Sequence, residues 1–225
     1  MTELKLSPLE QPDSLAKRAY KALYNCILAG ELKLGEVYNE KELAKYLQIS
    51  RTPVREALLE LSTKGLVTFL PRKGIQISQF NSKDLNEIFE LRKALEISSV
   101  QKVASLANSE NISHLESILQ EQKEHAKNQN FMDFLQKDRE FHAELSQITG
   151  NKRLCNVLDE LRDLIQIMGS HALIVQGRIE EVLEEHEKIV QSIAKGDTEK
   201  ACLNMDIHLE KTKENAERTL FSNRS

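Results

Sequence analysis

The second part of the chain limits the possible folds most, because residues 82–225 contain no proline and no strand-like alternation of apolar and polar residues. Apolar residues recur there at three- and four-residue spacing, with interruptions near residues 108–109, 128–130, 150–151, 169–170 and 196–197. This spacing gives each segment one apolar face that must be buried against its neighbours. The pattern predicts about six helices in an antiparallel bundle, and therefore a mainly α protein.

Two charged residues interrupt the apolar face of the first of these helices. Arg92 and Glu96 lie on the face that Leu85, Phe89 and Leu95 mark as inward. Burying either charge without a partner would be costly. An ion pair at four-residue spacing is one interpretation. In the other, Arg92 points into a cavity and binds the carboxylate of an effector.

A later helix has a carboxylate and an imidazole in its buried face. Asp138 and His142 are four residues apart, so they share a face and could reach a single metal ion or simply bond to each other. His186 and His208 occupy inward positions on two further helices. Three neutral imidazoles and one carboxylate suit a divalent metal and leave room for a water or ligand oxygen. We expect zinc, with nickel, manganese and iron as alternatives.

The remaining histidines and the cysteines do not extend this set. His114 and His125 lack a matching partner and are expected at the surface or rim, whereas His171 could line the mouth of a pocket. The three cysteines, Cys26, Cys155 and Cys202, are widely spaced and form no Cys-x-x-Cys pair. They indicate neither a disulfide framework nor a thiolate zinc site.

Residues 1–80 predict three short helices followed by a hairpin. Ser14 can cap the first helix and Gly30 can end it, while Asn39 opens the second with Glu42 three residues later. Strand-like segments at 66–70 and 75–78 flank the basic turn 71–74. This order predicts a winged helix-turn-helix over residues 1–80, with the helical bundle as a second domain over residues 81–225.

The third helix presents positive charge at its start. Ser50 is a good N-cap, Pro53 is tolerated in the first turn, and Arg51, Thr52 and Arg55 gather around the positive end of the helix dipole. This combination suits phosphates and guanine edges, as in a DNA-recognition helix. Residues 1–80 hold 12 Lys+Arg against 9 Asp+Glu, and residues 81–225 hold 19 against 26, so only the first domain suits a polyanion.

Residues 14–78, centred on ILAGELKLGEVYNEKELAKYLQISRTPVREALLELSTKGLV, resemble the winged helix-turn-helix of the GntR superfamily of bacterial transcription regulators. The resemblance implies that Arg51 reads a base and that Lys41, where the family usually has Arg, is a second base reader without the bidentate fork. It implies phosphate or groove contacts for the other predicted DNA-binding residues: Ser50, Thr52, Arg55, Lys73 and Gly74.

The second half resembles the FCD effector domain of the FadR-like branch of the same superfamily. The matching segments are DLNEIFELRKALE, DREFHAEL followed by GN, EEHEKIVQSIAKGD and NMDIHL. The metal ligands of metal-containing members correspond to Asp138, His142, His186 and His208. The resemblance implies that the metal holds a small organic acid by its carboxylate, with Arg92 as a second anchor.

These observations predict a ligand-responsive, homodimeric transcription regulator that binds a palindromic double-stranded DNA operator and is not an enzyme. We expect the protein to repress transcription and the effector to relieve that repression. No apolar run reaches membrane-span length, so we expect a cytoplasmic protein without a membrane partner. Two alternatives stay open: a metal-dependent hydrolase or lyase, for which Glu96 and His171 are the candidate acids or bases, and a metal that is structural or is itself the signal.

Overall fold

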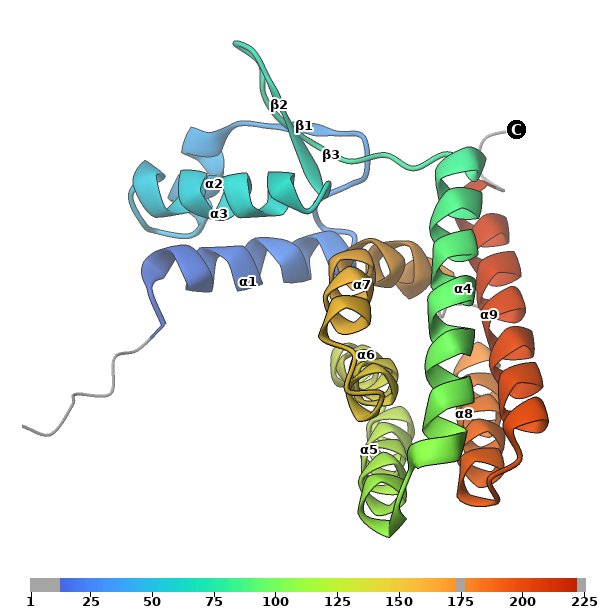
Figure 1. The fold of residues 1–225 in the computed structure, drawn as a ribbon. Helices are drawn as coiled ribbons and strands as arrows, with labels where there is room; N and C mark the ends of the chain where they lie inside the picture. Colours follow the sequence, from blue (N-terminus) through green and yellow to red (C-terminus); the bar gives the residue numbers. More distant parts are fainter. Residues whose placement is uncertain (1–12, 173–176, 222–225) are drawn as a thin grey trace, which may run out of the picture. The chain divides into compact units, whose positions relative to one another are not determined.

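A computed structural model describes residues 13–172 and 177–221, and its contacts divide the chain into two compact units, Met1–Gln79 and Phe80–Ser225. Figure 1 shows the described helices and strands of both units. Helices dominate, and the strands form one small sheet in the first unit. The mainly α fold class predicted from the sequence is therefore confirmed.

The first unit contains three helices: α1 (Leu15–Leu28), α2 (Glu40–Tyr46) and α3 (Arg51–Thr63). The side chain of Ser14 accepts a hydrogen bond from the backbone N–H of Lys17 at 3.2 Å, so the predicted cap of α1 forms. Asn39 caps α2 by accepting from the N–H of Lys41 at 2.8 Å. Ser50 occupies the N-cap position of α3, but its side chain makes no capping bond. The Ser50 hydroxyl therefore does not cap α3.

The sheet of the first unit has three antiparallel strands in the order β1-β3-β2: β1 (Val37–Tyr38), β3 (Gly74–Ile77) and β2 (Val67–Leu70). The β2–β3 hairpin is the predicted wing, with Phe69 opposite Ile75. Strand β1 was not predicted, because two residues are too short to show alternation. It pairs Tyr38 with Ile75 and connects the wing to the segment before α2.

Gly74, the first residue of β3, is fixed by this pairing. Its φ is +121°, and a Cβ atom on it would lie 2.3 Å from the backbone oxygen of Tyr38. A backbone oxygen cannot move aside as a flexible side chain can. The close approach of β1 and β3 therefore requires glycine at this position.

The second unit contains six helices in its described residues: α4 (Ser82–Leu106), α5 (Ser109–Lys127), α6 (Phe131–Ile148), α7 (Lys152–Ala172), α8 (Arg178–Ala194) and α9 (Thr198–Phe221). Reciprocal capping boxes at Asn81 and Asn108 fix the starts of α4 and α5. The break predicted near residues 169–170 lies a few residues later, since α7 continues to Ala172 and α8 begins at Arg178. One helical glycine costs only about 1 kcal/mol relative to alanine, and packing can offset that cost.

The core of the second unit is built from the predicted apolar faces. Helix α4 lies alongside α9 (Figure 1), and buried side chains from α4, α5, α6, α8 and α9 form one cluster. Val100, Phe141, Ile189 and Met205 are fully buried within it. The polar groups described next lie beside this cluster, so they must find their partners within the protein.

We expect Gly74→Ala to destabilise the wing by about 2–3 kcal/mol, because the added methyl group combines backbone strain with the collision at Tyr38. Gly35→Ala is the matched control in the same unit, since Gly35 also has positive φ but faces the movable end of Gln79. Its expected cost is only about 1 kcal/mol. Hydrogen exchange of the β3 amides measures both effects, and equal protection in the two variants would contradict the steric argument.

Candidate metal centre and DNA-binding face

Three histidines from three helices meet in the interior of the second unit. His142 on α6, His186 on α8 and His208 on α9 are 4%, 0% and 2% exposed. One ring nitrogen from each lies within 4.8 Å of the other two. The ring of His186 also stacks on Phe141, with ring centroids 4.1 Å apart. The tertiary structure therefore brings these three predicted ligands together.

Hydrogen bonds on the far side of each ring fix where its proton lies. The Nδ1 atom of His142 bonds to Glu96, that of His186 to Gln122 Oε1 at 3.0 Å, and that of His208 to Glu185 Oε2 at 2.8 Å. These oxygens only accept, so each Nδ1 carries the proton and each Nε2 keeps its lone pair.

Two of the Nε2 atoms are buried and have no hydrogen-bond partner among the described residues, namely those of His186 and His208. A buried acceptor without a partner is costly in an ordinary core. A divalent ion that accepts these lone pairs removes that cost. The donor set therefore fits a metal, and it has the nitrogen ligands that zinc and other transition metals prefer.

Asp138, the fourth predicted ligand, lies at the edge of the histidine cluster. Its Oδ1 atom is 3.7 Å from Nε2 of His186 and accepts a hydrogen bond from Nε2 of Gln122 at 3.3 Å. Its side chain is 24% exposed, unlike the histidines. Asp138 lies four residues before His142 on α6, so both side chains point to the same face, as predicted.

Both interpretations of Arg92 and Glu96 describe part of the structure. Arg92 Nε and Glu96 Oε1 form an ion pair at 2.6 Å within α4, and both side chains are buried. A terminal nitrogen of Arg92 also lies 3.2 Å from Nε2 of His142, and Arg92 lines a cavity. Burial alone would raise the pKa of Glu96, but His142 and Arg92 hold it well below its usual range.

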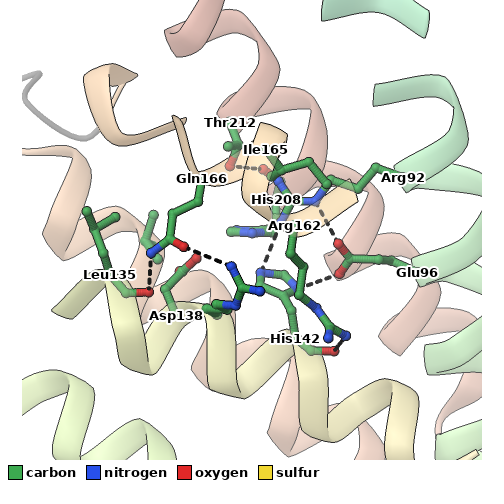
Figure 2. A pocket seen from close by; sticks show the side chains of 12 residues that line it. Arg92, Glu96, Leu135, Asp138, His142, Arg162, Ile165, Gln166, His208 and Thr212 are labelled. Carbon is green, nitrogen blue, oxygen red and sulfur yellow. Dashed lines mark hydrogen bonds and ion pairs between the residues drawn. The ribbon is translucent and has the colours of Figure 1, made fainter. Parts of the chain in front are cut away.

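The cavity beside the histidines is small and has a mixed lining (Figure 2). Its volume is about 50 Å³. Polar side chains and the apolar side chains of Leu135, Ile165 and Val182 share its wall. The lining residues with ionisable side chains are Arg92, Glu96, Asp138, Arg139, His142, Arg162 and His208.

Burial keeps the imidazoles of His186 and His208 neutral. Burial lowers the pKa of His208 and, with help from nearby positive charge, lowers the pKa of His186 well below the usual range. Burial alone would raise the pKa of Glu185, but hydrogen bonds from His208 and Arg178 bring it to about 2. Glu185 is therefore an anion that accepts from Nδ1 of His208, and it offsets part of the effect of burial on the pKa of that histidine.

Sequence reasoning missed three of the residues that surround the ligands: Gln122, Arg178 and Glu185. Gln122 had a detectable signal, because it is a polar residue in the apolar face formed by Leu115, Ile118 and Leu119. Arg178 is 2% exposed and donates to both oxygens of Glu185, at 2.7 and 2.8 Å.

The remaining histidines behave differently. His114 and His125 form longer contacts with carboxylates nearer the surface, and the side chain of His171 lies outside the described residues.

The predicted DNA-binding residues lie mainly on the exposed side of the first unit. Lys41, Ser50, Arg51, Thr52, Arg55 and Lys73 are exposed, and Gly74 is partly buried. Glu40 on α2 accepts from Arg55 at 3.2 Å and lies 3.9 Å from Arg51. One carboxylate thus restrains both arginines. A groove runs from these arginines to the turn between β2 and β3.

Comparisons with known proteins agree with both halves of the structure. Residues 15–77 match the bacterial regulatory proteins of the gntR family, and residues 87–211 match the FCD domain. The chain belongs to the GntR family. It is a DNA-binding transcription regulator with an FCD effector domain, and the proteins of this family are regulators rather than enzymes.

Relatives of this GntR-family regulator include an uncharacterised HTH-type transcriptional regulator of Bacillus subtilis, YdhC, which is 31% identical over 86% of this chain and 87% of its own length. The transcriptional repressor RspR of Escherichia coli is 24% identical over 94% of this chain and 92% of its own. Among solved structures, E. coli McbR/YncC superposes with a TM-score of 0.78 at 21% identity, over 92% of this chain and 99% of that one. Among the described helices of this regulator, none is long and apolar enough to cross a membrane.

The buried histidines predict how stability depends on pH. The pKa values of His186 and His208 are lower in the folded protein than in the unfolded chain, so the unfolded chain binds protons first as the pH falls. The stability from neutral His186 and His208 is fully present above about pH 6.5 and is lost below it. In chelator-treated protein, we expect the free energy of unfolding to fall by at least about 1 kcal/mol between pH 7 and 5.5.

Denaturant unfolding at several pH values measures this slope. His186→Gln should flatten it, whereas His114→Gln should not, because the side chain of His114 is 54% exposed. A wild-type slope that survives in His186→Gln would show that other groups control it.

Proposed function

We propose that the FCD domain binds a divalent metal through Asp138, His142, His186 and His208, and that this site makes DNA binding responsive to a small organic acid. The observation that carries the proposal is the convergence of three buried imidazoles whose protons point away from their meeting point. When bound, the metal supplies positive charge to a carboxylate oxygen of the effector. Zinc fits the donor set best, with nickel, manganese and iron as alternatives.

Arg92 is the proposed second anchor for the acid. Its terminal nitrogen now donates toward Nε2 of His142, at 3.2 Å. This lone pair cannot serve Arg92 and a metal at the same time. Metal binding would therefore release one end of the guanidinium toward the cavity, while Glu96 still holds Nε at 2.6 Å. The small cavity volume favours an acid with few carbon atoms.

In the proposed mechanism, a homodimer places two α3 helices on the half-sites of a palindromic operator. Arg51 and Lys41 read bases, while Ser50, Thr52, Arg55 and Lys73 contact phosphates and Gly74 lets the wing approach the minor groove. The acid changes helix packing in the FCD domain and so the spacing of the two recognition helices. The acid is proposed to release repression, and the repressor activity named for the relative RspR supports this direction.

The geometry gives less support to the alternatives. A hydrolase would need a free acid or base beside the metal, but Glu96 is committed to both Arg92 and His142. A metal that is structural, or that is itself the signal, predicts thermal shifts with metal and none with a panel of small carboxylic acids. Such a result would remove the organic acid from the proposal and keep the metal.

We expect Arg51→Ala to weaken operator binding about 10- to 100-fold, because the variant loses a base contact. Arg18→Ala is the matched control, since Arg18 is an exposed arginine on α1 of the same unit. Gel-shift titrations with operator and with unrelated DNA measure the two effects. Unchanged operator affinity in Arg51→Ala would remove its assignment as a base reader.

We expect the double variant His186→Ala/His208→Ala to lose the metal that the purified wild-type protein carries, because two of four ligands are gone. The control is His114→Ala/His125→Ala, which removes the same number of histidines away from the cluster. Elemental analysis of freshly purified proteins, with circular dichroism to check the fold, measures the difference. Equal metal content in all three proteins would exclude the proposed site.

A further inference from the structure

Gln122 on α5 is 0% exposed and uses both ends of its amide on the proposed metal ligands. Its Oε1 atom accepts from Nδ1 of His186 at 3.0 Å, and its Nε2 atom donates to Oδ1 of Asp138 at 3.3 Å. We propose that Gln122 is a positioning residue that sets the tautomer of His186 and the orientation of both ligands together. This inference rests on the proposed metal site and goes beyond its ligand set.

The two ends of the amide have opposite hydrogen-bonding character, so its orientation has consequences at both ligands. With Oε1 toward His186, the imidazole proton must be on Nδ1, and Nε2 keeps the lone pair that a metal needs. With Nε2 toward Asp138, the carboxylate accepts as an anion. Turning the amide over would require a proton on Nε2 of His186 and a protonated Asp138. The observed orientation is therefore the one that leaves both groups able to bind a metal.

The other two histidines are held differently. His142 and His208 bond to Glu96 and Glu185, which are carboxylates and cannot donate. A carboxylate at position 122 could still accept from His186, but it would repel Asp138. Among the described residues, no other side chain donates a hydrogen bond to Asp138. Asp138, the more exposed ligand, thus depends on the amide of Gln122, which the fully buried His186 also needs.

Gln122 also connects its own helix to two helices that carry proposed ligands. It joins α5 to Asp138 on α6 and to His186 on α8. Its neighbours on α5, Leu115, Ile118 and Leu119, are apolar and buried. A glutamine is costly at such a position unless both ends of its amide have partners. The ligands provide those partners, which explains a polar residue in an otherwise apolar stripe.

The test compares Co²⁺ binding by wild-type protein, Gln122→Met, Gln122→Glu, Asp138→Asn and Gln120→Met, using competition with a chromophoric chelator and the d–d absorption spectrum. Methionine matches glutamine in length but cannot form either hydrogen bond. We expect Gln122→Met to bind Co²⁺ about 10- to 100-fold more weakly, with a changed spectrum. Gln120→Met is the control, because Gln120 is exposed on the same helix and should behave as wild type.

The glutamate variant separates positioning from loss of packing. Gln122→Glu keeps the acceptor for His186 and loses the donor for Asp138, so its spectrum should shift in the same direction as that of Asp138→Asn. If wild-type protein binds Co²⁺ and Gln122→Met has the same affinity and spectrum, the positioning role is wrong while the metal site stands. If wild-type protein does not bind Co²⁺, the metal site itself is wrong.

Discussion

The structure of the second unit depends on one constraint: the polar groups beside its apolar core must be paired. Glu96, Gln122 and Glu185 satisfy one nitrogen of each buried histidine. The same three bonds leave the opposite nitrogens as acceptors that face one another. Pairing that stabilises the fold therefore also prepares a site for an electron-pair acceptor. The same hydrogen bonds thus stabilise the fold and would support the proposed metal site.

In both units, single carboxylates each contact two basic groups. In the second unit, Glu96 bonds to both Arg92 and His142, and Glu185 bonds to both Arg178 and His208. Each carboxylate thus holds a cation and an imidazole together. In the first unit, Glu40 approaches both Arg51 and Arg55 on α3 while their side chains stay exposed to solvent. Such pairing restricts an arginine to fewer conformations before it binds. Less conformational entropy is then lost on binding.

The sequence and the structure disagree where local signals were weak or ambiguous. The sequence predicts a helix break near residues 169–170, but α7 continues to Ala172, because one glycine is too small a penalty to end a helix. Strand β1 gave no periodic signal over two residues. Gln122 was overlooked although it interrupts an apolar stripe, because a single polar residue in one helix does not reveal its partners on two others.

Periodicity and capping residues determined most of the architecture: the helices, the wing hairpin and the inward positions of Asp138, His142, His186 and His208 follow from local spacing. Local spacing cannot say which atoms meet. Only the tertiary structure decided that the three imidazoles converge, that their protons lie on Nδ1, and that Arg92 contacts His142. These features depend on side chains more than 20 residues apart in sequence, and packing of the helices alone brings such side chains within bonding distance.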